Sequence, residues 1–352
     1  MTLNSLHHAL DYGLNKMIKK ILITSILIIL ALSLYANFVH NEIFSSRNEL
    51  SHLDTTSYGK GIPISFKSGK YTLKGNLLVP KLSGRKYPVI IFSVGSGLSS
   101  YASNYTKLLD SLFEQNLPLD SVAVLYFDKR GIGQSEGKWF NTSFEERAAD
   151  VKAAADYLKT LSTIDTNKIA VVGHSQGGWI VQICLAKYPE TFIGGISMAG
   201  PTFSIKKQLI NDYQSKFICA ENLDSIKANR KAEKSVNRDL FFTSLFPFKD
   251  GWKQLQVTKN FEPSSYLKKI GKPILFMFAE NDALVYPNWC LKELSNVFPD
   301  GLPHNFDTMV IKGANHGFKM SSLCFNGSFK TIPYSDDCKK AVLNWTRQVL
   351  LN

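Results

Sequence analysis

The chain has 352 residues, of which 44% are apolar, and it carries a formal net charge of +12. This length and composition suffice for a large buried core, and the basic charge accompanies no nucleic-acid-binding motif, so we expect no nucleic-acid partner. Neither a Cys-x-x-Cys nor a His-Glu-x-x-His spacing occurs, and Gly131-Ile132-Gly133 lacks the third glycine or the lysine of a nucleotide-binding loop. The sequence therefore predicts no metal and no cofactor.

An apolar segment near the N-terminus, Ile21 to Ala36, follows the basic residues Lys16, Lys19 and Lys20. This order is typical of a secretory signal, and residues 1–36 are predicted to be a signal peptide or a membrane anchor. Sixteen helical residues span about 24 Å, less than the roughly 30 Å of a bilayer core, which favours a cleaved peptide. In either case the rest of the chain is expected to be exported, as a periplasmic, extracellular or membrane-anchored protein that faces outward.

Strand-like and helix-like segments alternate from Ile90 to the C-terminus, which favours an α/β fold with a mostly parallel sheet covered on both faces. In the loop at Asp128 to Gly137, Arg130 is expected to tie neighbouring loops together. The segment from Phe144 to Leu158 has the apolar spacing of an amphipathic helix, with Asp150 near its polar margin.

The pentapeptide Gly173-His174-Ser175-Gln176-Gly177 follows an apolar strand-like run and precedes a helix-like one. Gly-x-Ser-x-Gly in this context is typical of a nucleophile elbow, a sharp strand-to-helix turn that exposes the serine hydroxyl to a histidine. The two glycines lack a Cβ and allow the neighbouring backbone to approach while Ser175 takes up a strained conformation. His174 is expected to pack within the elbow. Ser175 is therefore the candidate nucleophile.

An acid and then a histidine are expected after later strands. The buried strand-like run Lys272 to Ala279 leads into a loop with Asp282, the candidate acid, and Glu280 is its runner-up. A shorter apolar run leads into the glycine-flanked His316, the candidate base. His316 would take the serine proton, while Asp282 would hold the imidazole tautomer and stabilise the imidazolium.

With these motifs the chain resembles the α/β hydrolases, and among them the single-domain serine hydrolases of the dipeptidyl aminopeptidase-like or serine aminopeptidase-like group. Further segments match the family's entry hairpin, third strand and fourth-strand loop, so the resemblance covers residues 58–352; these are Gly69–Pro80, Tyr87–Gly97 and Asp128–Gly137. It implies an oxyanion hole formed by the backbone N–H groups of Gln176 and Ser96. Val94 departs from the family pattern, which usually has histidine at this position, so the alignment of this loop leaves its register open by one residue.

Residues 201–268 lack the strand and helix alternation, and the resemblance implies that this insertion forms a helical cap over the active site. Its aromatic residues either select the substrate or pack the cap onto the core; they are Phe241, Phe242, Phe246, Phe248 and Trp252. Its basic residues fit a solvated helical face, and they would also suit anionic lipid or an acidic polymer.

The five cysteines leave the disulfide connectivity open. Cys184 is expected to be buried and free. A bridge between Cys324 and Cys338 would suit an oxidising compartment, and Cys219 and Cys290 either pair or remain thiols.

The sequence predicts a serine hydrolase that cleaves an ester, thioester or amide of a small substrate through an acyl-enzyme, with esterase favoured. A peptidase acting on small peptides or acyl-peptides is an alternative, and transfer of the acyl group to an acceptor other than water is another. A third alternative is a non-catalytic envelope binding module on the same scaffold.

Overall fold

The computed structural model describes residues 3–39, 61–80, 85–103, 105–117 and 121–352. The predicted start of the hydrolase domain at Tyr58 lies outside these residues. A mixed sheet of eight strands forms the centre of the molecule, in the order β1-β2-β4-β3-β5-β6-β7-β8. The strands are β1 (Ile62–Ser68), β2 (Tyr71–Leu78), β3 (Tyr87–Ser93), β4 (Ala123–Phe127), β5 (Ile164–His174), β6 (Gly194–Met198), β7 (Ile274–Ala279) and β8 (Phe306–Ile311).

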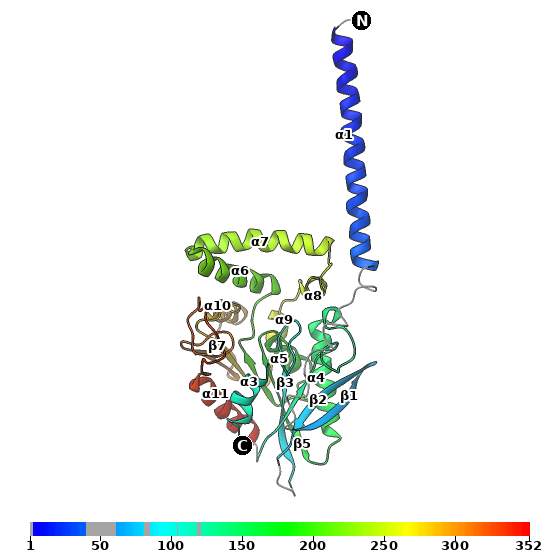
Figure 1. The fold of residues 1–352 in the computed structure, drawn as a ribbon. Coiled ribbons are helices and arrows are strands. Elements are labelled where there is room, and N and C mark those ends of the chain that lie inside the picture. The colour runs from blue at the N-terminus through cyan, green and yellow to red at the C-terminus, as the bar shows by residue number, and fades with distance from the viewer. Residues whose placement is uncertain (1–2, 40–60, 81–84, 104, 118–120) are drawn as a thin grey trace.

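The β1–β2 hairpin pairs antiparallel with itself and with β4, and all pairs from β4 through β8 are parallel. Helices α4 (Phe144–Lys159) and α5 (Gln176–Lys187) cover one face, and α11 (Asp336–Thr346) with the short α3 (Thr106–Leu109) covers the other (Figure 1). Alternate residues of β3 enter the two cores, Val89 and Ile91 one of them and Ile90 and Phe92 the other. Because both faces are buried, the strands read as apolar runs. The predicted mostly parallel α/β fold is confirmed.

Four helices separate β6 from β7: α6 (Ile205–Glu221), α7 (Ser225–Leu245), α8 (Asp250–Thr258) and α9 (Ser264–Leu267). The first three lie together above the sheet, where α7 crosses the top of the molecule (Figure 1). Serine and aspartate caps begin two of them: the Ser204 side chain accepts from the Lys207 N–H, and Asp224 from two N–H groups. Helix α10 (Pro287–Val297) follows β7 in the chain.

The N-terminal helix α1 (Leu3–Leu34) continues as a π-helical turn, Tyr35–Val39. Its segment Leu14–Phe38 is, among the described residues, the one helix long and apolar enough to cross a membrane, a property that a signal sequence shares. The end of this helix contacts the insertion. The hydroxyl of Ser33 donates to the Leu245 carbonyl oxygen at 2.9 Å, and the side-chain amide of Asn37 donates to the same oxygen at 3.3 Å. That carbonyl belongs to the last turn of α7, where carbonyl oxygens have no N–H donor within the helix.

The disulfide in the structure is neither the Cys324–Cys338 bridge nor the Cys219–Cys290 pair that the sequence left open. Cys219, at the end of α6, is bonded to Cys324, whereas Cys290 and Cys338 are buried thiols. Cys338 begins α11 and packs into the core, which removes it from the loop that the sequence suggested it would bridge. Cys184 is buried and free, as predicted.

The Cys219–Cys324 bond closes a separation of 105 residues, so the double substitution Cys219→Ser and Cys324→Ser should lower the free energy of unfolding. A decrease of about 2–4 kcal/mol is expected in denaturant titrations, because the cross-link restricts the unfolded chain. Peptide mapping under non-reducing conditions should yield one linked peptide pair that contains these two cysteines. A pair that links Cys324 to Cys338 would contradict the assignment.

Candidate active site

Ser175 occupies the turn between β5 and α5 with φ 58° and ψ −123°, a strained conformation for a residue with a side chain. Its backbone N–H donates to the Met198 carbonyl oxygen of the neighbouring strand at 2.8 Å. Close packing explains the flanking glycines. A Cβ at Gly173 would lie 2.2 Å from the Gly177 carbonyl oxygen, and one at Gly177 would lie 2.2 Å from that of Ser93. The strand, turn and helix therefore hold this serine in the geometry expected of a nucleophile elbow.

The loops after β7 and β8 bring Asp282 and His316 together. His316 Nδ1 lies 2.7 Å from Asp282 Oδ2, and the carboxylate is fully buried. The other carboxylate oxygen, Oδ1, accepts the backbone N–H groups of Leu284 and Val285, each at 2.8 Å. The carboxylate is thus fixed on one side and directed at the imidazole on the other. Glu280 is exposed and accepts the Gly313 N–H instead, so it is Asp282 that meets His316.

His174 connects the elbow to the loop of His316. Its Nε2 lies 2.7 Å from the His316 carbonyl oxygen and its Nδ1 lies 2.7 Å from the Tyr105 hydroxyl. Because a carbonyl only accepts, Nε2 must carry the proton, and Nδ1 accepts from Tyr105. The Tyr105 oxygen in turn accepts the Gly95 N–H at 2.9 Å. One chain of hydrogen bonds therefore joins the loop after β3, the elbow and the His316 loop.

Burial fixes the protonation states of His174 and Tyr105, the two side chains of this hydrogen-bond chain. Desolvation, together with the nearby His316, lowers the pKa of His174 to about 3, so His174 is a neutral imidazole at neutral pH. Burial raises the pKa of the Tyr105 hydroxyl well above its usual value of about 10, so it keeps its proton. The prediction that His174 packs within the elbow is confirmed, since its exposed fraction is 6%.

Two buried cations hold the loop after β3. Arg147 donates from Nη2 to the Val94 carbonyl oxygen at 2.6 Å and from Nη1 to Gln176 Oε1 at 2.7 Å. Lys129 donates from Nζ to the Gly95 carbonyl oxygen at 2.7 Å. Burial lowers the pKa of Arg147 to about 10, and it lowers the pKa of Lys129 well below its usual value. Arg147 thus links this loop directly to the first residue of α5.

The backbone N–H groups of Ser96 and Gln176 lie on either side of the candidate nucleophile, in the loop after β3 and at the start of α5. Among the residues that the structure describes, neither group has a hydrogen-bond acceptor, whereas the Gly95 N–H is occupied by Tyr105. The Ser96 residue is exposed and Ser175 is partly exposed. Free N–H donors beside a serine hydroxyl are suited to bind an oxyanion.

Sequence inspection did not assign Tyr105, Lys129 or Arg147. Arg147 had a visible signal, since it lies three residues after Phe144 and four before Val151, on the apolar face of α4. A basic residue on such a face needs buried acceptors, and here these are a carbonyl and an amide oxygen. Tyr105 and Lys129 carried no comparable signal because their partners are distant loops.

Arg130 ties neighbouring elements together, as predicted. It is paired with Asp150 at 2.8 Å and with Glu146 at 2.8 Å, and it lies over the ring of Tyr71 at 4.8 Å. The prediction that Asp150 lies at the polar margin of α4 is wrong. Its exposed fraction is 1%, because the helix face beside the β1–β2 hairpin is covered and the carboxylate accepts from Arg130 and from the Ser68 hydroxyl.

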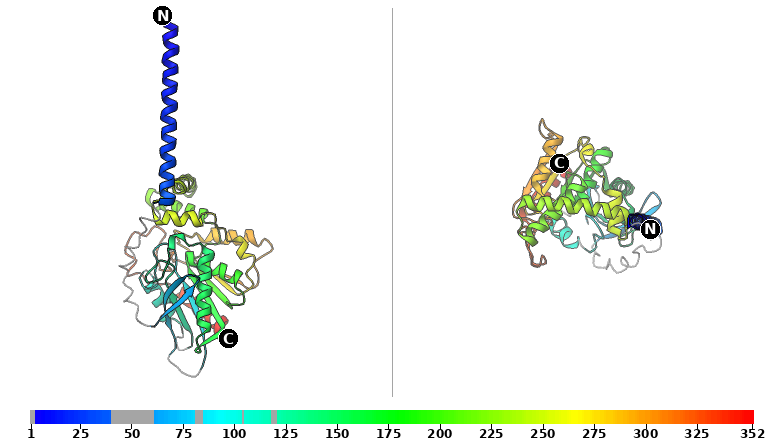
Figure 2. Two further views of the ribbon diagram at one scale, coloured as in Figure 1. Left: turned by 90° about the vertical axis from the view of Figure 1, so that its right-hand side faces the viewer. Right: turned by 90° about the horizontal axis from the view of Figure 1, so that it is seen from above.

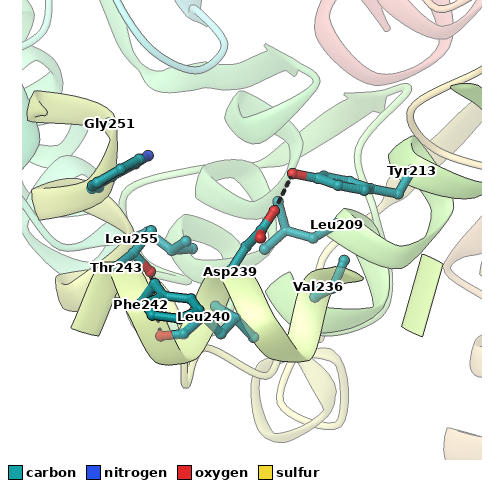
Figure 3. A pocket seen from close by; sticks show the side chains of 10 residues that line it. Leu209, Tyr213, Val236, Asp239, Leu240, Phe242, Thr243, Gly251 and Leu255 are labelled. Atoms are coloured by element: carbon teal, nitrogen blue, oxygen red, sulfur yellow. Dashed lines mark hydrogen bonds between the residues drawn. The ribbon is translucent and has the colours of Figure 1, made fainter. Parts of the chain in front are cut away.

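The insertion rests on the loop that carries Asp282. Gln208 of α6 donates to the Leu284 carbonyl oxygen, and the Tyr286 N–H donates to Asn211 of the same helix. Above this contact, helices α6, α7 and α8 enclose a mostly apolar cavity of about 500 Å³ (Figure 3). Its lining includes two of the five aromatic residues singled out in the sequence; the residues are Leu209, Tyr213, Val236, Asp239, Leu240, Phe242, Thr243, Gly251, Trp252 and Leu255. Within the described residues, no group of three or more His, Cys, Asp or Glu side chains could hold a metal ion.

Comparison with known proteins agrees with this geometry. The profile of a family described as serine aminopeptidase, S33, matches residues 88–316, about two thirds of the chain and all of the region just described. The chain belongs to this family of α/β hydrolases. Membership of this family makes it a hydrolase, and Ser175, Asp282 and His316 all lie within the matched residues.

The chain is similar to a curated enzyme in sequence and to several solved structures in fold. Acylamino-acid-releasing enzyme 1 of Oryza sativa subsp. japonica is 30% identical over 107 residues, which is 30% of this chain and 14% of that enzyme. The chain thus spans about a seventh of the length of this curated relative. An esterase of Pyrococcus furiosus has the same fold at 16% identity and a TM-score of 0.54, covering 84% of this chain and 93% of the esterase. An acylaminoacyl peptidase of Pyrococcus horikoshii gives 19% identity and a TM-score of 0.52, covering 82% of this chain and 42% of the peptidase.

The contact of Gly177 with Ser93 predicts that Gly177→Ala will lower both the stability and the activity of the protein. The added methyl group would lie 2.2 Å from a backbone oxygen, so the elbow or β3 must shift. We expect a loss of about 3 kcal/mol in the free energy of unfolding, the upper range for overpacking. Gly271→Ala is the matched control, because a Cβ there meets nothing within 4 Å, and it should change stability by less than about 0.5 kcal/mol. Equal effects of the two substitutions would contradict the packing of the elbow.

Proposed function

We propose that this protein is a serine hydrolase that cleaves an ester of a small substrate through an acyl-enzyme, with Ser175 as nucleophile, His316 as general base and Asp282 as the supporting acid. The observation that carries the proposal is the joining of a strained elbow serine to a loop whose histidine is hydrogen-bonded to a buried aspartate. A strained backbone at a serine and a buried carboxylate that faces a histidine both cost stability, and such features cluster at active sites.

The reaction follows from these groups. His316 Nε2 takes the Ser175 proton as Oγ bonds to the substrate carbonyl carbon, and the carbonyl electrons move to the oxygen. The imidazolium then protonates the leaving alcohol as the carbon–oxygen bond breaks, which leaves an acyl-serine. A water molecule then gives a proton to His316 as its oxygen bonds to the acyl carbon. His316 returns this proton to Ser175 Oγ as the bond between Oγ and the acyl carbon breaks, which releases the acid and restores the enzyme. Asp282 stabilises the imidazolium and holds the Nδ1 proton, which is the role its 2.7 Å contact supports.

The oxyanion formed in each half-reaction is proposed to bind the backbone N–H groups of Gln176 and Ser96. Their lack of acceptors among the described residues supports this role, and the Tyr105 bond to Gly95 supports Ser96 over its neighbour. Arg147 and Lys129 would keep the loop after β3 in position through its carbonyl oxygens. Because these donors are fixed before substrate binds, little reorganisation is needed in the transition state.

An ester is favoured over a peptide with a free amino terminus. Recognition of an amino group needs an unpaired carboxylate, and the carboxylate that lines the cavity of the insertion, Asp239, already accepts from the Tyr213 hydroxyl at 2.6 Å and from Arg238 at 2.9 Å. Most of the other lining side chains are apolar, which suits an acyl or aryl group of a substrate that extends from Ser175 into the insertion; Ser175 and His316 do not themselves line this cavity. A peptidase acting on small peptides or acyl-peptides is the second candidate, because the family description denotes an aminopeptidase and the name of the curated relative denotes the release of acylamino acids.

The domain organisation and location complete the proposal. Residues 58–352 would form the hydrolase domain, residues 201–268 its cap, and residues 1–36 an export signal or anchor. The contact of α6 with the Asp282 loop and the apolar helix near the N-terminus support these assignments. The catalytic domain would then face the periplasmic or extracellular side, where the Cys219–Cys324 disulfide is stable.

A fluorophosphonate probe tests the nucleophile directly. The folded protein should be labelled on Ser175, and Ser175→Ala should abolish labelling and lower kcat on short acyl esters by about 10⁴-fold or more. Ser162→Ala, a matched change at an exposed serine beyond α4, should leave both unchanged. The labelled site is identified by peptide mass spectrometry.

If the wild-type protein fails to react with the probe, the catalytic proposal is wrong and a non-catalytic binding module is favoured. If Ser175 is labelled, comparison of short acyl esters with aminoacyl amides and acyl-peptides separates the two hydrolase candidates. A higher kcat/KM for the esters is expected, and product analysis with added alcohols shows whether the acyl group passes to an acceptor other than water.

The position of Asp282 predicts that substitution of this carboxylate lowers kcat far more than substitution of the neighbouring Glu280. Asp282→Asn should lower kcat about 10⁴-fold, because an amide favours the wrong imidazole tautomer. Glu280→Gln removes the exposed runner-up, which contacts the Gly313 backbone rather than His316, and should retain nearly full activity. Steady-state ester hydrolysis measures both. A larger loss for Glu280→Gln would reverse the assignment of the acid.

A further inference from the structure

Helix α7 presents a basic face to solvent. One side of the helix is buried and includes Ala228, Ala232, Val236 and Thr243. The opposite side follows a spacing of three and four residues, and all its members are exposed; they are Lys227, Arg230, Lys234, Asn237, Arg238 and Phe241. We refer to these six residues as the outer face of α7. Phe241, at its C-terminal end, is 60% exposed.

The charge of this face is poorly compensated. Helix α7 contains five basic residues and only two acidic ones, Glu233 and Asp239. The Asp239 carboxylate is turned toward the cavity, where it accepts from Tyr213 (Figure 3). Within the described part of the chain, neither Arg230 nor Lys234 has an ion-pair partner. Lys227 pairs with Asp224 and Arg238 pairs with Asp239, so Arg230 and Lys234 are the cations of this face that lack a partner among the described residues. Unpaired cations beside an exposed aromatic ring are suited to an anionic surface with an apolar interior.

The N-terminal helix fixes the orientation of this face. In Figure 1, α1 stands upright beside the C-terminal end of α7, which runs across the view. Figure 2 agrees: α7 is seen end-on beside the base of α1 in one view, and from above it crosses the molecule while α1 is seen along its axis. The contact between them is specific, because Ser33 and Asn37 both donate to the Leu245 carbonyl oxygen and Gln256 donates to Asn37.

We propose that the outer face of α7 docks on the anionic headgroups of the bilayer in which α1 is anchored, with Phe241 inserted at the interface. If α1, whose apolar segment Leu14–Phe38 is long enough to span a membrane, lies along the bilayer normal, α7 lies parallel to the bilayer surface at the level where α1 leaves it. Its cations are then held within a Debye length, about 10 Å, of the headgroups.

Docking places the insertion between the bilayer and the carboxyl ends of the sheet strands. Helix α6, directly beneath α7, contacts the Asp282 loop, and the cavity between these helices lies just below the docked face. Phe242, which follows the inserted Phe241, is 50% exposed and also lines that cavity. The proposal goes beyond the proposed function and does not depend on Ser175, so the two fail separately.

The test uses the full-length chain in nanodiscs, with an environment-sensitive NBD fluorophore attached to Asn237→Cys on the outer face. Labelling is selective because the three free cysteines, Cys184, Cys290 and Cys338, are buried. In discs that contain about 30% phosphatidylglycerol, the emission should rise about threefold over phosphatidylcholine discs, and lipids with a shallow doxyl group should quench it. Raising the salt concentration should reverse the increase.

The matched variants separate charge from position. Arg230→Glu with Lys234→Glu, made in the labelled background, should abolish the increase. Lys340→Glu with Arg347→Glu, two exposed residues at the opposite end of the molecule, changes the net charge equally and should preserve it. Thermal unfolding of each variant verifies that the fold is intact.

Three results would overturn the proposal. The first is equal NBD emission in the two lipid mixtures, and the second is an increase that persists in the Arg230 and Lys234 variant. The third is an equal response to soluble polyglutamate without discs, which would assign the face to an acidic polymer. Intact-mass measurement of the exported protein provides a separate check, since a chain cleaved after residue 36 lacks the anchor that orients α7.

Discussion

A single buried imidazole, that of His174, holds the candidate site together. Its two nitrogens contact groups from opposite sides of the site, the Tyr105 hydroxyl and the His316 carbonyl oxygen, each at 2.7 Å. Burial keeps it neutral, which is necessary because a charged imidazole could not accept from Tyr105. Since His174 directly precedes Ser175 in the chain, the same residue that ends β5 also fixes the two loops that surround the nucleophile candidate. Loss of either hydrogen bond would leave a buried polar group without a partner.

The parts of the site that sequence analysis located are those encoded by local pattern. The glycines around Ser175 belong to a short motif that predicts a strand-to-helix turn by itself. Asp282 and His316 each follow an apolar run, and these runs form strands that end at the same edge of a parallel sheet. The structure brings the last two into contact. Strand-like segments and a mostly parallel sheet could also be predicted from apolar runs, because a sheet buried on both faces leaves few polar residues in its strands.

The remainder depended on contacts between distant segments, which no local pattern records. Cys219 meets Cys324 across 105 residues because the end of α6 lies over the loop after His316, whereas proximity in sequence suggested Cys338. Asp150 was placed at a polar margin by helical periodicity, but the β1–β2 hairpin covers that margin. Ser33 and Asn37 interrupt an apolar helix one turn apart, and their acceptor is a carbonyl more than 200 residues away. Polar residues at apolar positions, such as Ser33 and Asn37, were thus a sign of contacts with distant segments, although local patterns do not identify the partner.

The most direct test of the account is a crystal structure of the protein after reaction with a small fluorophosphonate. We expect a covalent bond from Ser175 Oγ to phosphorus, the phosphonyl oxygen about 2.7–3.1 Å from the backbone nitrogens of Gln176 and Ser96, and His316 still bonded to Asp282. A phosphonyl oxygen directed away from both nitrogens, or a covalent bond to any other residue, would contradict the proposed site.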